Sequence, residues 1–118
     1  RLFAEAGLIA MTSFISPYRR DRDQARALHA AAAIPFVEIF VDTPPAVCEK
    51  RESELYRRAR AGELGDVSGI DAGYEVPEAA EITVDGGAGS AEEIAERIVT
   101  ELYGSGVLDP EKLLGAGI

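Results

Sequence analysis

Three arginines fall within one short stretch, Leu55-Tyr-Arg-Arg-Ala-Arg-Ala-Gly-Glu63. Their guanidinium groups suit phosphate oxygens because they present planar, permanently charged pairs of donors. Arg57 and Arg58 are adjacent and Arg60 follows two positions later, so a helix cannot place all three on one stripe. Two interpretations stay open: at least one arginine faces an anion-binding cleft, or the segment is a solvated basic helix.

Ser16 is a second candidate site residue. It follows a nearly continuous apolar run, Leu8–Phe14, which is the pattern of a strand buried on both faces. Pro17 then interrupts the strand. Because parallel sheets bind ligands at the carboxyl ends of their strands, the Ser16 hydroxyl would lie at such a site. The alternative is a serine that satisfies the loop backbone before proline.

A third candidate is the glycine-rich loop at residues 86–89, between a predicted strand and a predicted helix. Backbone amides at a helix N-terminus favour phosphate. The lysines, Lys50 and Lys112, are not part of a Gly-Lys-Ser/Thr sequence, so this loop is not a P-loop. A plain turn is the alternative.

Apolar patterning predicts the elements that position these residues. Strands are expected at residues 8–14, 36–41 and 80–85, and helices at 19–33, at 52–61, at 90–103 and in a short segment after Pro44. Ser90 and Glu93 have the spacing of a capping box. Strands that alternate with helices predict a parallel α/β sheet. The glycine-rich segment Gly62–Pro77 is expected to be the most mobile internal stretch.

Length and composition limit the classes of function. A chain of 118 residues suits a single domain. Its 12 basic and 21 acidic residues give a net charge of −9, which argues against a generic nucleic-acid binder. With one cysteine, Cys48, and one histidine, His29, neither a disulfide nor a metal site is expected. The sequence has no long apolar run, so we expect no membrane segment and a cytoplasmic location.

The order of these motifs resembles the adenylylsulfate kinase (APS kinase) family. The resemblance rests on TSFISPYRRDRDQAR, PFVEIFVDTP, LYRRARAGE and GIDAGYEVPE, and it extends from residue 1 to about residue 103. It implies a three-layer α/β fold like that of P-loop nucleoside triphosphate hydrolases, with the N-terminal strands missing. It also implies transfer of the γ-phosphate of ATP to adenylylsulfate, giving ADP and PAPS in sulfate assimilation, with Mg²⁺.

The resemblance assigns roles to particular residues. Ile15 and Ser16 match the pair that contacts adenylylsulfate, and Ser16 matches the position of a phosphoserine intermediate in bacterial members. The lid would span residues 52–80 or so, and a tail residues 104–118. The remaining assignments are lid arginines with a catalytic role (Arg57, Arg60), ATP-binding residues (Arg58, Gly89) and further substrate-binding residues (Asp66, Val67).

The chain also departs from the family pattern. The family's P-loop and its Asp-x-x-Arg segment precede the position at which this sequence starts, so the chain alone is expected to be inactive. Glu52-Ser53-Glu54 stands where the family has a substrate-binding lysine, and Val67 stands where it has an aromatic residue. These changes leave a second hypothesis open: a degenerate, non-catalytic module that binds a nucleotide or a partner. A homodimer and a fusion to ATP sulfurylase are further expectations.

Overall fold

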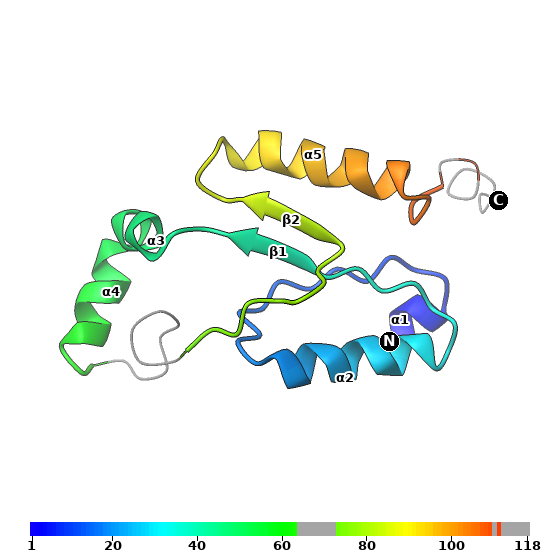
Figure 1. Ribbon diagram of the computed structural model, residues 1–118, viewed down its shortest axis with the longest axis horizontal. Coiled ribbons are helices and arrows are strands. Elements are labelled where there is room, and N and C mark those ends of the chain that lie inside the picture. Colours follow the sequence, from blue (N-terminus) through cyan, green and yellow to red (C-terminus); the bar gives the residue numbers. More distant parts are fainter. Residues whose placement is uncertain (64–72, 110, 112–118) are drawn as a thin grey trace. The chain divides into compact units, whose positions relative to one another are not determined.

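The computed structural model describes residues 1–63, 73–109 and 111, and Figure 1 shows its helices and strands. The elements are α1 (Leu2–Glu5), α2 (Arg19–Ala30), β1 (Ile39–Asp42), α3 (Pro45–Arg51), α4 (Ser53–Arg60), β2 (Ile82–Asp85) and α5 (Ala91–Gly104). The chain divides into two compact units. Arg1–Phe36 and Pro44–Ala79 form the helical unit, whereas Val37–Thr43 and Ala80–Ile118 form the sheet unit.

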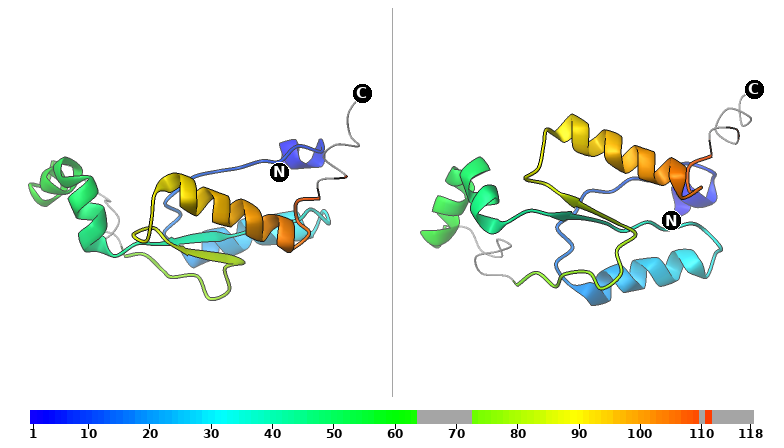
Figure 2. Two further views of the ribbon diagram at one scale, coloured as in Figure 1. Left: turned by 90° about the horizontal axis from the view of Figure 1, so that it is seen from above. Right: turned by 45° about the horizontal axis from the view of Figure 1, so that its top comes forward.

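The sheet unit is built on two parallel strands. β1 pairs with β2 in a register that places Ile39 opposite Ile82 and Asp42 opposite Asp85. Side chains of a strand alternate between its faces, and Ile82 and Val84 are accordingly both buried, with 5% and 1% of their surface exposed. Helix α5 packs against β2 (Figure 2). The predicted parallel arrangement is confirmed for these two strands, whose long connection carries α3 and α4.

Helix α5 begins at the predicted capping box. The Ser90 hydroxyl accepts a hydrogen bond from the Glu93 backbone amide at 3.2 Å, and the Glu93 carboxylate accepts one from the Ser90 amide at 2.8 Å. Two amides that the first turn of a helix would leave without partners are thereby satisfied.

We expect Ser90→Ala to destabilise the chain by about 1 kcal/mol, because the amide of Glu93 loses its acceptor. Urea unfolding followed by circular dichroism measures this loss. Ser105→Ala is the control, since the Ser105 hydroxyl donates to the Leu102 carbonyl at the other end of α5 and caps no amide. Equal losses in the two variants would contradict the capping role.

The strand predicted at residues 8–14 is wrong. This segment forms no strand, and its large apolar side chains are exposed: Met11 by 92% and Phe14 by 80%. A strand that is buried on both faces needs neighbours that bond its backbone and cover its side chains. Among the described residues, β1 and β2 pair with each other and not with this segment. The second predicted strand forms, but it starts at Ile39 rather than at Phe36.

Candidate functional site

The backbone around Ser16 has an unusual conformation. Ser16 has a φ of 42°, which lies in the left-handed region that residues other than glycine rarely adopt. Its carbonyl oxygen accepts a hydrogen bond from Nη1 of Arg22 at 2.5 Å. Ser16 is half-buried, whereas the neighbouring Ile15 is exposed. A strained, partly buried residue is typical of a functional loop.

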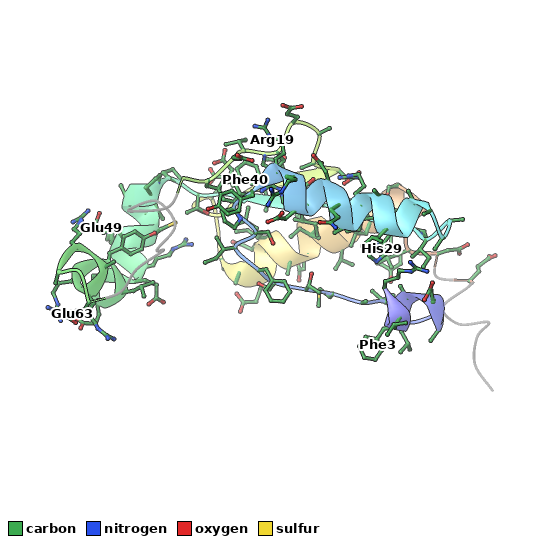
Figure 3. The ribbon with its side chains drawn as sticks, turned by 90° about the horizontal axis from the view of Figure 1, so that it is seen from below. Phe3, Arg19, His29, Phe40, Glu49 and Glu63 are labelled. Atoms are coloured by element: carbon green, nitrogen blue, oxygen red, sulfur yellow. The ribbon has the colours of Figure 1, made fainter. Side chains whose placement is uncertain are left out.

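The Ser16 loop is joined to a segment far away in the sequence. The amide of Glu75 donates to the Pro17 carbonyl at 2.9 Å, and the Glu75 carboxylate accepts from the Arg19 amide at 2.7 Å. The Arg19 side chain reaches the same segment, with its Nη1 atom 2.6 Å from the Glu78 carboxylate. Figure 3 shows Arg19 at the start of α2, beside this segment. The FISPY and YEVPE motifs therefore meet within the helical unit.

Arg22 makes a second connection between the same two motifs. Its Nη2 atom donates to the Glu75 carbonyl at 2.5 Å, and its guanidinium carbon lies 5.3 Å from the centre of the Tyr74 ring. Sequence reasoning did not single out Arg19, Arg22 or Glu75. These three residues lie in the motifs on which the resemblance rests, but the sequence does not show how close the two motifs are in the folded chain.

The three arginines that the resemblance assigns to a lid all lie on α4, and each is ion-paired with a nearby glutamate. The closest distances are 2.6 Å for Arg57–Glu54, 3.1 Å for Arg58–Glu63 and 2.5 Å for Arg60–Glu49. Glu49 lies on α3 and Glu63 follows α4 (Figure 3). Ala59, between the arginines, is the buried residue of this helix.

These ion pairs are exposed, so they hold the arginines weakly. Exposed pairs of this kind contribute about 0–1 kcal/mol each, since water and salt screen them. A phosphate group could therefore replace a glutamate as the partner of a lid arginine at small cost. Of the two interpretations of the arginine segment, the solvated basic helix describes the geometry of α4, and the exposed guanidinium groups have the chemistry that the anion-binding interpretation needs.

The Arg57 guanidinium lowers the pKa of Glu54 below its ordinary value through a hydrogen bond to the Glu54 carboxylate. Because the folded-state pKa is depressed, the pair stabilises the fold above the ordinary pKa, and this contribution disappears as the pH falls through the lowered pKa. We expect Arg57→Gln to return the pKa of Glu54 towards its ordinary value, as measured by a carboxyl NMR titration. Arg58→Gln, which alters a different pair, should leave it unchanged. A Glu54 titration that is insensitive to Arg57→Gln would contradict the assignment.

Gly89 lies in the sheet unit, in the loop between β2 and α5. A Cβ atom at this position would lie 2.9 Å from Oε2 of Glu93, so the capping carboxylate occupies the space beside Gly89. The nearby Gly87 amide donates to the Asp85 carboxylate at 2.7 Å. Ser16 and the lid arginines belong to the helical unit, and Gly89 therefore belongs to a different unit. Asp66 and Val67 lie outside the described residues.

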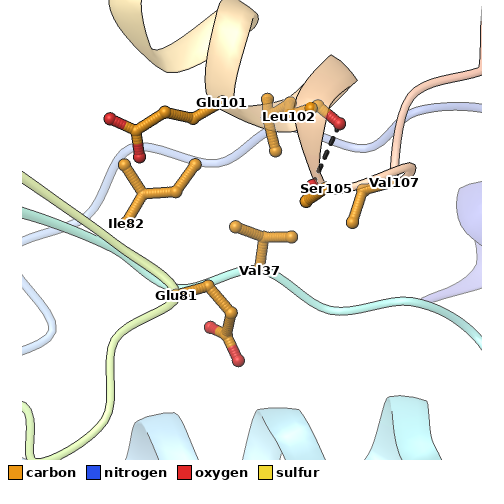
Figure 4. A pocket seen from close by; sticks show the side chains of 8 residues that line it. Val37, Glu81, Ile82, Glu101, Leu102, Ser105 and Val107 are labelled. Carbon is orange, nitrogen blue, oxygen red and sulfur yellow. Dashed lines mark hydrogen bonds between the residues drawn. The ribbon is translucent and has the colours of Figure 1, made fainter.

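The sheet unit also contains a pocket of about 380 Å³ between the start of β2 and the end of α5 (Figure 4). Apolar side chains of Val37, Ile82, Leu102 and Val107 line it. Glu81 lies at its edge, and its carboxylate accepts a hydrogen bond from the Glu38 amide at 2.8 Å. No residue that the sequence predicted for the site lines this pocket.

Within residues 1–63, 73–109 and 111, no group of three or more His, Cys, Asp or Glu side chains is arranged to hold a metal ion. The helices in the same ranges are too short or too polar to cross a membrane.

Comparison with known proteins identifies the family. The adenylylsulphate kinase family model matches residues 1–85. The chain belongs to this family. An adenylyl-sulfate kinase from Lactiplantibacillus plantarum is 52% identical over 86 residues, which are 72% of this chain and 41% of that protein. The bifunctional enzyme NodQ of Azospirillum brasilense is 43% identical over 110 residues, which are 92% of this chain and 17% of NodQ.

A solved structure confirms the fold class of this adenylylsulphate kinase family member. The Mycobacterium tuberculosis APS kinase CysC, in complex with AMPPNP and APS, matches with a TM-score of 0.80 and 37% sequence identity. The match covers 86% of this chain and 59% of that chain. The predicted P-loop type of α/β fold, with a parallel sheet flanked by helices, is thus correct. The chain spans less than half the length of the two curated relatives.

Proposed function

We propose that this chain works as part of an adenylylsulfate kinase, which transfers the γ-phosphate of ATP to the 3′-hydroxyl of adenylylsulfate to give ADP and PAPS in sulfate assimilation. The observation that carries the proposal is the Ser16 loop, held at positive φ and joined to the Glu75 segment. This loop occurs in a chain that matches the structure of an APS kinase in complex with AMPPNP and APS.

In this proposal the site residues divide by the group that they contact. Ile15, Ser16, Asp66 and Val67 contact adenylylsulfate, with the Ser16 hydroxyl as the polar contact. Arg57 and Arg60 neutralise the charge of the transferring phosphoryl group, and Arg58 and Gly89 contact ATP. Phosphoryl transfer depends mainly on positioning and charge stabilisation, and exposed guanidinium groups supply the latter once a phosphate replaces their glutamate partners.

ATP and Mg²⁺ need more than these residues. The 118 residues contain no Gly-x-x-x-x-Gly-Lys-Ser/Thr sequence to hold the β- and γ-phosphates. Kinase sites usually hold Mg²⁺ by one or two carboxylates together with the substrate phosphates, so we propose that the main Mg²⁺ site forms with such a sequence and not from the described residues alone. We assign them no metal-dependent step, and we propose that turnover requires a phosphate-binding loop in the same domain.

Partners and location are further parts of the proposal. Similarity to a bifunctional enzyme, NodQ, supports a fusion or association with a second activity, for which we propose ATP sulfurylase. We also propose a homodimer and a cytoplasmic location. The chain has a single cysteine, Cys48, and therefore cannot form an internal disulfide, which suits a reducing compartment.

The test uses a kinase domain in which these 118 residues follow a phosphate-binding loop. ADP release from ATP is measured with and without adenylylsulfate. We expect adenylylsulfate-dependent turnover that Ser16→Ala lowers by about tenfold or more, because the hydroxyl contacts the substrate. Ser13→Ala, in the same loop, is the control and should change turnover by less than about twofold. Nucleotide binding without any turnover would favour the non-catalytic module instead.

A further inference from the structure

Arg22 contacts groups from two distant segments of the chain. One terminal nitrogen donates to the Ser16 carbonyl and the other to the Glu75 carbonyl, both at 2.5 Å. Its guanidinium carbon lies over the Tyr74 ring, 5.3 Å from the ring centre. The rigid fork of an arginine can bridge two carbonyls in this way, whereas a lysine offers a single charged nitrogen.

Arg22 affects the candidate site through its hydrogen bond to the Ser16 carbonyl. A left-handed residue other than glycine costs of order 1–3 kcal/mol and persists where its surroundings hold it. The Arg22 hydrogen bond fixes the carbonyl of the residue that has this conformation. The backbone angles set the direction of the Ser16 Cα–Cβ bond and limit the allowed χ1 rotamers, so the same bond restricts the positions that the hydroxyl can take.

The second carbonyl ties this loop to the lid region. Glu75 and Tyr74 fall within the lid range expected from the sequence, residues 52–80 or so, and near its C-terminal end. The Glu75 amide also donates to the Pro17 carbonyl at 2.9 Å, so Arg22 and this bond cross-link the same two segments. Opening of either segment must break both connections.

We propose that Arg22 is a positioning residue that holds the Ser16 loop in its left-handed conformation and couples it to the C-terminal end of the lid. Its effect on adenylylsulfate is exerted through Ser16, and this part rests on the proposed function. The coupling of the two segments rests on the geometry of the helical unit alone.

Hydrogen exchange tests the coupling without any assay of activity. In the kinase domain described above, Arg22→Ala should speed exchange of the Glu75 and Arg19 amides together by about tenfold, since both bond across the junction. Arg20→Ala is the matched control: Arg20 lies in the same turn of α2, its side chain is 88% exposed, and it pairs with the adjacent Asp21. Unchanged exchange in Arg22→Ala, or equal changes in both variants, would overturn the proposal.

Kinetics test the positioning of Ser16. Arg22→Ala should raise the KM for adenylylsulfate by about tenfold and leave the KM for ATP within about twofold, and Arg22→Lys should fall between this variant and the parent. A purely structural role would instead lower the active fraction of the enzyme and leave both KM values unchanged, which would overturn the proposal.

The two tests separate the possible failures. If the parent domain forms no PAPS, the proposed function fails, and hydrogen exchange still decides whether Arg22 couples the segments. If Arg22→Ala does not fold, Arg22→Lys and Tyr74→Leu replace it. Each should speed exchange at Glu75 and Arg19 to a smaller extent, and an unchanged rate in both variants would contradict the coupling.

Discussion

Arg60→Ala should lower kcat/KM for adenylylsulfate by roughly 10²-fold in a kinase domain that contains this chain and a phosphate-binding loop, because one charged donor to the transferring phosphoryl group is lost. Stability should barely change, since the Arg60–Glu49 pair is exposed. The measurement is steady-state PAPS formation, with the melting temperature recorded for each variant.

Arg97→Ala is the matched control for Arg60→Ala. The Arg97 side chain is 58% exposed and lies 3.6 Å from Glu101 in an ion pair, compared with 60% exposure for Arg60. Arg97 lies on α5 of the sheet unit, whereas Arg60 lies on α4 of the helical unit. We expect its removal to change kcat/KM by less than about twofold. Similar losses in the two variants would refute a specific role for Arg60.

Gly86→Ala should be the most destabilising small substitution at the end of the sheet. Gly86 is buried, and its amide donates to the Asp42 carbonyl at 3.0 Å. A Cβ atom there would lie 2.1 Å from Oγ1 of Thr43 and 2.9 Å from Cγ1 of Val41, so the strand ends must move apart. Overpacking of this kind costs about 1–3 kcal/mol. Urea unfolding of the chain measures the loss.

Gly104→Ala serves as the control for Gly86→Ala. Gly104 is the last residue of α5, and a Cβ atom there would meet no heavy atom within 4 Å. Alanine at this helical position should be neutral or stabilising by up to about 1 kcal/mol. Thr43→Ala combined with Gly86→Ala should recover part of the loss, because the closest clash is removed. A Gly86→Ala chain as stable as the Gly104→Ala chain would contradict the close approach.

Local signals in the sequence predicted local structure well. The Ser90–Glu93 spacing predicted the cap of α5, and the apolar pattern predicted a strand at residues 80–85, where β2 forms. Both patterns depend on residues that are neighbours in sequence. The Leu8–Phe14 prediction was wrong because a strand also depends on distant partners.

The candidate site could be predicted only in part for the same reason. Motifs identified Ser16 and the lid arginines as chemically suitable groups. The contacts that join the Ser16 loop to the Glu75 segment link residues more than 50 positions apart, such as Arg22 and Glu75. Neither the periodicity of apolar residues nor the spacing within a motif can predict such a contact. Most of the segment predicted to be mobile, Gly62–Pro77, lies outside the described residues, so its mobility stays a prediction.

The most direct test of the account compares PAPS formation by two polypeptides under the same conditions. One is the 118-residue chain, and the other is a kinase domain in which these residues follow a phosphate-binding loop. With ATP, Mg²⁺ and adenylylsulfate, the account predicts PAPS from the longer polypeptide and none above background from the 118 residues, since lid arginines cannot replace the loop that holds the β- and γ-phosphates. PAPS formation by the 118-residue chain alone, abolished by Ser16→Ala, would contradict it.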